Sequence, residues 1–198
     1  MYQIFAMQNL FIIAGPNGAG KTTASYTVLP EMLDCKEFVN ADEIAKGISP
    51  FQPDKAAIDA GRLMLIRIKD HVKHRATFAF ETTLSTRSYV NTILQAKECG
   101  YFVTLVYFWL SSPELAIERV KTRVSAGGHD IAVDVIKRRY LSGLKNLVNL
   151  YLPISDYWMI IDNSENPFKL IAEGNTNKNK QINDTNIWTK INHLANGK

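Results

Sequence analysis

Residues 15–22 read Gly15-Pro16-Asn17-Gly18-Ala19-Gly20-Lys21-Thr22 and match the pattern GxxxxGK[ST] at every fixed position. A Gly-rich turn of this kind lets backbone N–H groups point inward at phosphate oxygens, and the following helix adds its positive N-terminal end. We therefore expect residues 15–23, up to and including Thr23, to bind ATP. Lys21 is expected to bridge the β- and γ-phosphates, and the Thr22 hydroxyl to bind Mg²⁺.

The surroundings of this loop predict a layered α/β domain. The loop follows a short apolar run at residues 9–14 and opens a predicted helix at 20–30. Strands and helices then alternate along the chain, which indicates a parallel sheet covered on both faces. The remaining predicted strands are 37–40, 77–80, 102–109, 157–161 and 168–172, and the remaining predicted helices are 53–75, 88–99, 113–126, 132–150 and 187–194.

This pattern predicts the P-loop NTPase fold. We expect a doubly wound, mostly parallel sheet of five or six strands, with helices on both faces and a helical lid. Residues 1–198 are expected to form one domain with its core at about 9–172. Residues 173–198, rich in Asn and Lys at their start, are expected to add a polar loop or hairpin and a closing helix.

Four residues follow the ends of predicted strands: Gly15, Asp42, Glu81 and Asp162. Ligands of such sheets bind beyond the carboxyl ends of the strands, so these residues are expected to converge on one rim. Asp42 is the best candidate for a catalytic base, with capping of the next helix as the alternative. Asp162 and Asn163 are expected beside the adenine or as caps of a loop.

Arginines that stabilise a transferred phosphoryl group are expected in a lid. Arg119 and Arg123 are four residues apart on one predicted helix and share a face. Arg138 and Arg139 lie on the next predicted helix, across the plausible hinge at residues 127–128. We expect Arg123 and one of Arg138 and Arg139 to be catalytic. The alternative is a solvated basic helix face.

The acceptor is expected to bind after the third predicted strand. Glu81 is suited to contact a metal-bound water or the acceptor, and Thr83 and Arg87 lie in the next turn. GTPases are not indicated, because no NKxD or DxxG motif is present. A motor or an AAA-type ATPase is not indicated either, because the apolar run that ends at Asp162 comes late in a short chain.

The composition limits the partners and the compartment. The chain has 198 residues, of which 46% are hydrophobic and 21% charged, with a net charge of +4. This balance is typical of a globular protein, and the modest charge gives little support for nucleic acid as a partner. Cys35 and Cys99 show no CxxC spacing, and the apolar run at 101–110 is too short to span a membrane. We expect a cytoplasmic protein without a membrane partner.

The ordered set of motifs resembles the zeta toxin family of P-loop kinases. The set continues from the Gly-rich loop through Asn40-Ala41-Asp42, Phe80-Glu81-Thr82-Thr83-Leu84, Arg123 with Gly127-Gly128-His129, Arg138-Arg139-Tyr140 and Asp162-Asn163-Ser164. The resemblance spans roughly residues 9–172. It departs from the well-known toxins in its shorter chain, in Glu81-Thr82-Thr83 and in the Gly-Gly-His stretch, which look like a stand-alone subgroup.

The resemblance implies an ATP-dependent kinase whose acceptor is the 3′-hydroxyl of the amino sugar in UDP-N-acetylglucosamine. It also implies a small helical antitoxin as partner, Asp42 as the base, Thr83 near the acceptor and two lid arginines. Three alternatives stay open on the residues alone. They are a kinase for an antibiotic or a sugar acid, a binding protein that ATP controls without acceptor phosphorylation, and a polynucleotide 5′-kinase.

Overall fold

The computed structural model describes residues 7–128, 130–176 and 179–197. Seven strands form one sheet in the spatial order β2-β3-β1-β4-β5-β6-β7. Strands β1 to β5 run parallel, and β6 and β7 are antiparallel to their neighbours. The strand bounds are β1 Asn9–Ala14, β2 Phe38–Val39, β3 Phe78–Thr82, β4 Phe102–Trp109, β5 Tyr157–Asp162, β6 Lys169–Asn175 and β7 Lys180–Ile182.

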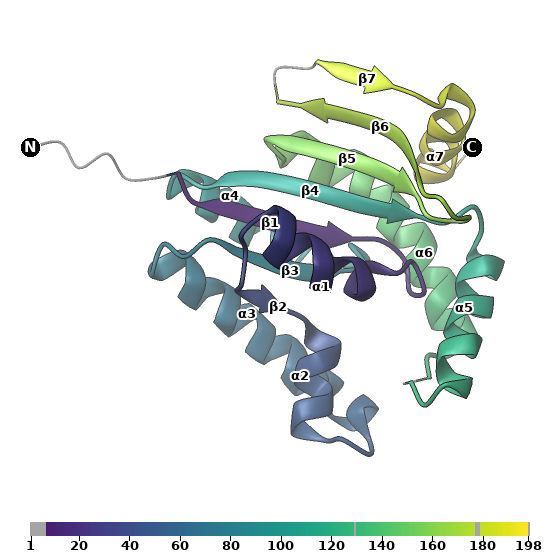
Figure 1. The fold of residues 1–198 in the computed structure, drawn as a ribbon, viewed down its shortest axis with the longest axis horizontal. Coiled ribbons are helices and arrows are strands. Elements are labelled where there is room, and N and C mark those ends of the chain that lie inside the picture. The colour runs from purple at the N-terminus through teal and green to yellow at the C-terminus, as the bar shows by residue number, and fades with distance from the viewer. Residues whose placement is uncertain (1–6, 129, 177–178, 198) are drawn as a thin grey trace, which may run out of the picture.

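Helices cover both faces of the sheet (Figure 1), with α1 in front and α4 and α6 behind. The α-helices are α1 Lys21–Met32, α2 Ala41–Ile48, α3 Ala57–Lys73, α4 Tyr89–Glu98, α5 Pro113–Ser125, α6 Val133–Asn146 and α7 Thr185–Asn196. Two short 3₁₀ turns, η1 Pro53–Ala56 and η3 Leu152–Ile154, and one π-helical turn, η2 Leu147–Tyr151, complete the elements. The predicted α/β P-loop fold is confirmed.

The sheet has seven strands where the sequence predicted five or six. The added strand is β7, which pairs antiparallel with β6, and it agrees with the hairpin alternative of the predicted polar loop or hairpin. Strand β7 is the edge of the sheet, so polar side chains can face water there without weakening the core. On this strand, Lys180 Nζ lies 4.9 Å from the ring centroid of Trp188 on α7.

The strand register brings the ends of the central strands to one edge. Ala14 at the end of β1 pairs with Thr82 on β3 and with Tyr107 on β4. The central strands are buried almost continuously, as expected for a parallel sheet covered on both faces. The turn after β1 therefore lies directly beside the end of β3. No helix in the described part of the chain is long and apolar enough to span a bilayer.

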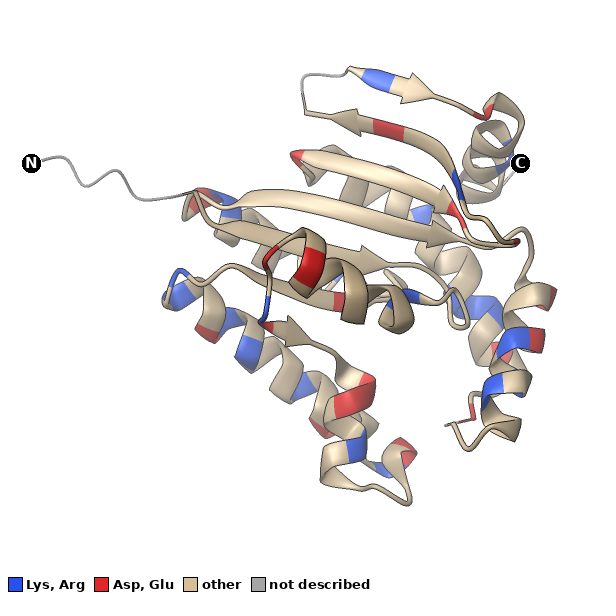
Figure 2. Cartoon of the chain, viewed as in Figure 1, with Lys and Arg blue, Asp and Glu red and all other residues tan. Residues whose placement is uncertain are grey.

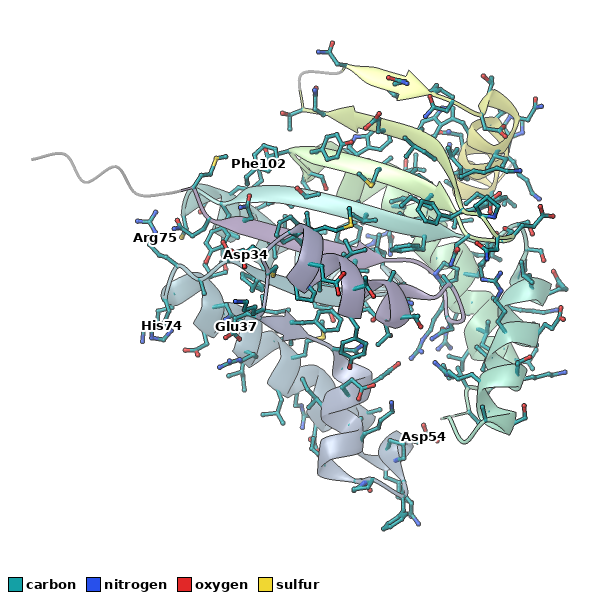
Figure 3. All side chains as sticks on the ribbon, viewed as in Figure 1. Asp34, Glu37, Asp54, His74, Arg75 and Phe102 are labelled. Atoms are coloured by element: carbon teal, nitrogen blue, oxygen red, sulfur yellow. The ribbon has the colours of Figure 1, made fainter. Side chains whose placement is uncertain are left out.

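A buried histidine, His71, lies at the end of the molecule that carries Glu37. The ring of His71 on α3 stacks on Phe78, with centroids 5.0 Å apart, and among the described residues its Nε2 has no hydrogen-bond partner. Burial, followed by the charge of Arg67, lowers the pKa of His71, and the carboxylates of Glu37 and Asp70 oppose that shift. Glu37 lies at this end of the molecule, far from α5 (Figure 3).

Candidate active site

The turn between β1 and α1 forms a cradle for an anion. Gly18 and Gly20 have φ angles of 76° and 79°, which place both in the left-handed region that favours glycine. Among the described residues, the backbone N–H groups of Asn17, Gly18 and Gly20 have no protein acceptor. The buried Asn17 Oδ1 also lacks a partner among these residues. Unpaired N–H groups at the start of a helix are suited to bind phosphate.

Glu81, at the end of β3, connects the residues of this cradle. One carboxylate oxygen accepts hydrogen bonds from the Thr22 hydroxyl at 2.7 Å and from Asn40 Nδ2 at 3.0 Å. The other lies 3.5 Å from Lys21 Nζ, and the side chains of Lys21 and Glu81 are only 6% and 9% exposed. Lys21 Nζ also donates to the Pro16 carbonyl at 3.0 Å. The cation of the loop is thus already paired with a carboxylate.

Asn40, between β2 and α2, positions the candidate base. Its Oδ1 accepts from the backbone N–H groups of Asp42 and Glu43, and so it caps α2. The capping role weighed for Asp42 therefore belongs to Asn40. Among the described residues, the exposed Asp42 carboxylate has no hydrogen-bond or ion-pair partner. It is free to accept a proton from a ligand.

Two cavities meet at this rim. The first, here the P-loop cavity, has a volume of about 260 Å³. Its lining consists of Asn17, Gly18, Gly20, Lys21, Thr22, Thr23, Asp42, Glu81, Arg119 and Arg123. The second, here the β3 cavity, has a volume of about 180 Å³. Its lining consists of Asn17, Lys21, Asn40, Ala41, Asp42, Met64, Glu81, Thr82, Thr83, Ser85, Thr86, Tyr89 and Arg139.

Four residues line both cavities: Asn17, Lys21, Asp42 and Glu81. Figure 2 shows bands of Lys and Arg on α5 and α6 where the parallel strands end. Arg123 on α5 lines the P-loop cavity, and Arg139 on α6 lines the β3 cavity. A ligand group in the P-loop cavity and a ligand group in the β3 cavity would therefore lie next to each other, beside the Asp42 carboxylate.

The remaining predicted site residues differ in whether they line one of the two cavities. Arg138 and Arg87 are exposed and are absent from the described lining of both cavities, whereas Thr83 lines the β3 cavity. Asn163 Nδ2 donates to the carbonyl of Ala19 at 2.9 Å, so it braces the P-loop from the end of β5. His129 lies outside the described residues.

The side chains of Asp162 and Arg119 both form hydrogen bonds with backbone groups of Ser164. Asp162 accepts from the N–H of Ser164 at 2.9 Å, which is the loop cap foreseen as one alternative. Arg119 donates to the Ser164 carbonyl at 2.8 Å and lines the P-loop cavity. A Cβ on Gly18 would lie 2.9 Å from the Ala116 carbonyl oxygen, so α5 packs directly on the loop.

The oxygen donors at the rim fit Mg²⁺. Thr22 supplies a hydroxyl and Glu81 a carboxylate, and the two are already within hydrogen-bond distance of each other. Mg²⁺ is usually held by one or two carboxylates together with substrate phosphates and waters. The described residues contain no cluster of three or more His, Cys, Asp or Glu side chains suited to a metal.

The sequence prediction missed several residues of the site. Asn40 stands before Asp42 at the end of a strand, and an Asn there is a signal for a helix cap that could have been recognised. Met64 and Tyr89 lie in the predicted helices 53–75 and 88–99, and neither was named as a candidate site residue. The Tyr89 hydroxyl donates to the Met64 sulfur at 3.4 Å, and burial raises the pKa of Tyr89. These two side chains form the apolar wall of the β3 cavity.

The chain belongs to the AAA_33 family, which is described as an AAA domain and whose sequence model matches residues 10–141. An uncharacterized protein of Haemophilus influenzae is 38% identical over 141 residues, which make up 70% of this chain and 97% of that protein. The matched span contains the P-loop and ends before β5, the strand that carries Asp162.

Solved structures share the fold at low identity. A chain in the crystal structure of AvrRxo1-ORF1:AvrRxo1-ORF2 with sulphate ions has a TM-score of 0.72 and 15% identity over 94% of this chain, which spans 64% of that chain's length. A chain of the PezAT toxin-antitoxin system of Streptococcus pneumoniae has a TM-score of 0.64 and 16% identity, covering 97% and 80% of the two chains.

A gluconokinase from Sinorhizobium meliloti has a TM-score of 0.53 and 12% identity, covering 80% of this chain and 83% of the gluconokinase. At these identities the structural likeness concerns the fold. Together with the family match, it defines a P-loop kinase-like domain. The zeta toxin subgroup stays a prediction from the sequence motifs.

Proposed function

We propose that this protein is an ATP-dependent phosphotransferase that moves the γ-phosphoryl group of ATP to a hydroxyl of a small acceptor. The observation that carries the proposal is the meeting of the two cavities at Asp42, Lys21, Glu81 and Asn17. In this assignment ATP phosphates bind in the P-loop cavity and the acceptor hydroxyl enters the β3 cavity. Asp42 then faces the reacting atoms from its capped helix.

Each residue has a definite part in the reaction. The acceptor oxygen attacks the γ-phosphorus while its proton passes to the Asp42 carboxylate. The bond from the γ-phosphorus to the bridging oxygen breaks, and ADP leaves. Lys21 and Arg123 stabilise the negative charge on the transferred group from the P-loop cavity, and Arg139 does so from the β3 cavity.

Mg²⁺, when bound with ATP, would neutralise charge on the β- and γ-phosphates. Thr22 and Glu81 are the residues that would hold it, directly or through water. Glu81 also orients Lys21 and Asn40, so its carboxylate links the nucleotide side of the site to the helix that carries Asp42. For this reason Glu81 serves both partners of the reaction rather than the acceptor alone.

The acceptor proposed first is UDP-N-acetylglucosamine, on the motif resemblance to the zeta toxins. The β3 cavity, at about 180 Å³, is smaller than the roughly 300–1,000 Å³ of pockets that enclose a drug-sized ligand. Only the sugar end of such an acceptor would enter it. A toxin-like activity restrained by an antitoxin belongs to the same proposal, and the structurally similar PezAT chain comes from a toxin-antitoxin system.

Purified protein incubated with Mg-ATP tests the proposal. The acceptors offered in parallel are UDP-N-acetylglucosamine, gluconate as a sugar acid and an aminoglycoside antibiotic. Mass spectrometry should detect one added phosphate on one acceptor, and the Lys21→Ala variant should give none. ATP binding by the wild type without phosphorylation of any acceptor would favour an ATP-controlled binding protein instead.

A further inference from the structure

The loop that joins β3 to α4 is held in an unusual backbone conformation. Leu84 has a φ of 55°, a left-handed value that a branched side chain adopts only when its surroundings enforce it. Leu84 is fully buried, and its N–H donates to the Thr82 hydroxyl at 3.1 Å. On either side of it, the loop presents Thr83, Ser85 and Thr86 to the β3 cavity.

Helix α6 and the turn after it hold this loop from behind. Asn146, only 6% exposed, donates from Nδ2 to the Leu84 carbonyl at 2.7 Å. The Tyr151 hydroxyl donates to the Thr86 carbonyl, also at 2.7 Å. A Cβ on Gly143 would lie 2.5 Å from the Thr83 carbonyl oxygen, so only glycine permits this approach of α6 to the loop.

The helix changes its geometry where it holds the loop. The α-helical pattern ends at Asn146, and the next five residues, Leu147–Tyr151, form a π-helical turn. Single π turns inside helices occur frequently at functional sites. Two turns before Asn146, the same helix carries Arg139 into the β3 cavity. One rigid element therefore sets both the cation and the hydroxyl-bearing loop of that cavity.

We propose that Asn146 is a positioning residue for the acceptor. This inference rests on the proposed function. Asn146 touches no residue of the P-loop cavity among its described contacts, and it acts through Leu84. Loss of its Nδ2 donor leaves a buried carbonyl unpaired and releases the left-handed turn. The hydroxyls of Thr83, Ser85 and Thr86 then lose their fixed directions, while the nucleotide site is unchanged.

The test compares Asn146→Ala with Asn149→Ala. Asn149 is the matched control, because it lies three residues further on, is exposed, and donates to the Lys145 carbonyl within its own helix at 2.9 Å. For Asn146→Ala we expect the KM for the acceptor to rise about tenfold or more, with the dissociation constant of ATP within about twofold of wild type. Asn149→Ala should match wild type in both.

Hydrogen exchange keeps the inference separate from the proposed function. In the absence of any acceptor, amides 83–88 should exchange about tenfold faster in Asn146→Ala than in Asn149→Ala, with amides of residues 15–25 unchanged. If the wild type phosphorylates no acceptor, the proposed function fails and the acceptor role fails with it, whereas the exchange result still shows whether Asn146 holds the loop.

Unchanged acceptor KM or unchanged exchange at 83–88 in Asn146→Ala would overturn the proposal. Equal loss of ATP affinity and acceptor affinity would also overturn it, because that pattern indicates general destabilisation. If Asn146→Ala does not fold, Tyr151→Phe removes the neighbouring donor to Thr86 with little change of shape. Tyr151→Phe should raise the acceptor KM in the same direction, and wild-type behaviour would contradict the inference.

Discussion

Asn40→Asp separates two roles that one side chain performs. Asn and Asp cap helices equally well, so the new carboxylate keeps the bonds to the N–H groups of Asp42 and Glu43. It cannot donate, however, and the Nδ2 bond to Glu81 at 3.0 Å is replaced by two facing carboxylates. The substitution therefore leaves α2 capped while it disturbs Glu81.

The expected effect follows from that contact. Loss of a hydrogen bond to a charged group costs about 1.5–3 kcal/mol. Two like charges about 3 Å apart add about 5 kcal/mol of repulsion at an effective dielectric of 20. The cation of Lys21 reduces this repulsion, and so does a proton shared between the two carboxylates. We expect kcat/KM for phosphoryl transfer to fall at least about a hundredfold, equivalent to about 2.7 kcal/mol.

Steady-state kinetics and thermal unfolding measure the two roles separately. Asn40→Asp retains the cap, which is worth about 1 kcal/mol, so a fall in its Tm reports the contact of the new carboxylate with Glu81 and not loss of the cap. Asn40→Ala is the matched comparison, because it removes the cap as well and should lower the Tm. Wild-type kcat/KM in Asn40→Asp would refute the reasoning, because Glu81 would then not depend on the Nδ2 bond.

Three further predictions test other parts of the structure. Arg139→Ala should lower kcat at least about tenfold, whereas Arg138→Ala should match wild type; equal effects in a transfer assay would contradict the placement of the two side chains. Gly20→Ala should weaken ATP binding about tenfold in calorimetry, because its Cβ would lie 2.9 Å from Asn163 Nδ2 at a φ of 79°, and wild-type affinity would count against the cradle. Since the folded state lowers the pKa of His71, its contribution to stability is complete above about pH 6.5 and is lost as the pH falls below that value. His71→Phe should therefore flatten the fall in Tm between pH 7.5 and 5, and identical acid slopes would contradict this account.

The elements built from local signals could be predicted from the sequence. The Gly-rich loop and the apolar runs located β1 and β4 with the bounds observed, because fully buried parallel strands are continuous in hydrophobicity. The rim that gathers Asp42 and Glu81 followed from the parallel order of strands. The region of β7 was predicted only as a polar loop or hairpin, because Lys180–Ile182 is a short polar edge strand without an apolar alternation.

The residues that hold the site-lining segments in place could not be identified from the sequence. Asn146 looked like one polar residue in a long helix, and only the packing of α6 on the loop reveals its bond to Leu84. The separation of Arg138 from Arg139 likewise depends on helix rotation, which adjacent positions do not specify. Contacts between residues 62 positions apart depend on tertiary packing, and local propensity contains no information about them.

The central claim is that Asp42 accepts the proton of an acceptor hydroxyl during transfer of the γ-phosphoryl group. The most direct test is single-turnover transfer of an isotopically labelled γ-phosphate from ATP to the acceptor, by wild type and by Asp42→Asn, with ATP affinity measured alongside. The account predicts label on the acceptor with the wild type, and transfer at least about a hundredfold slower in Asp42→Asn at unchanged ATP affinity. Equal transfer rates in the two proteins, or label released only as free phosphate by the wild type, would contradict it.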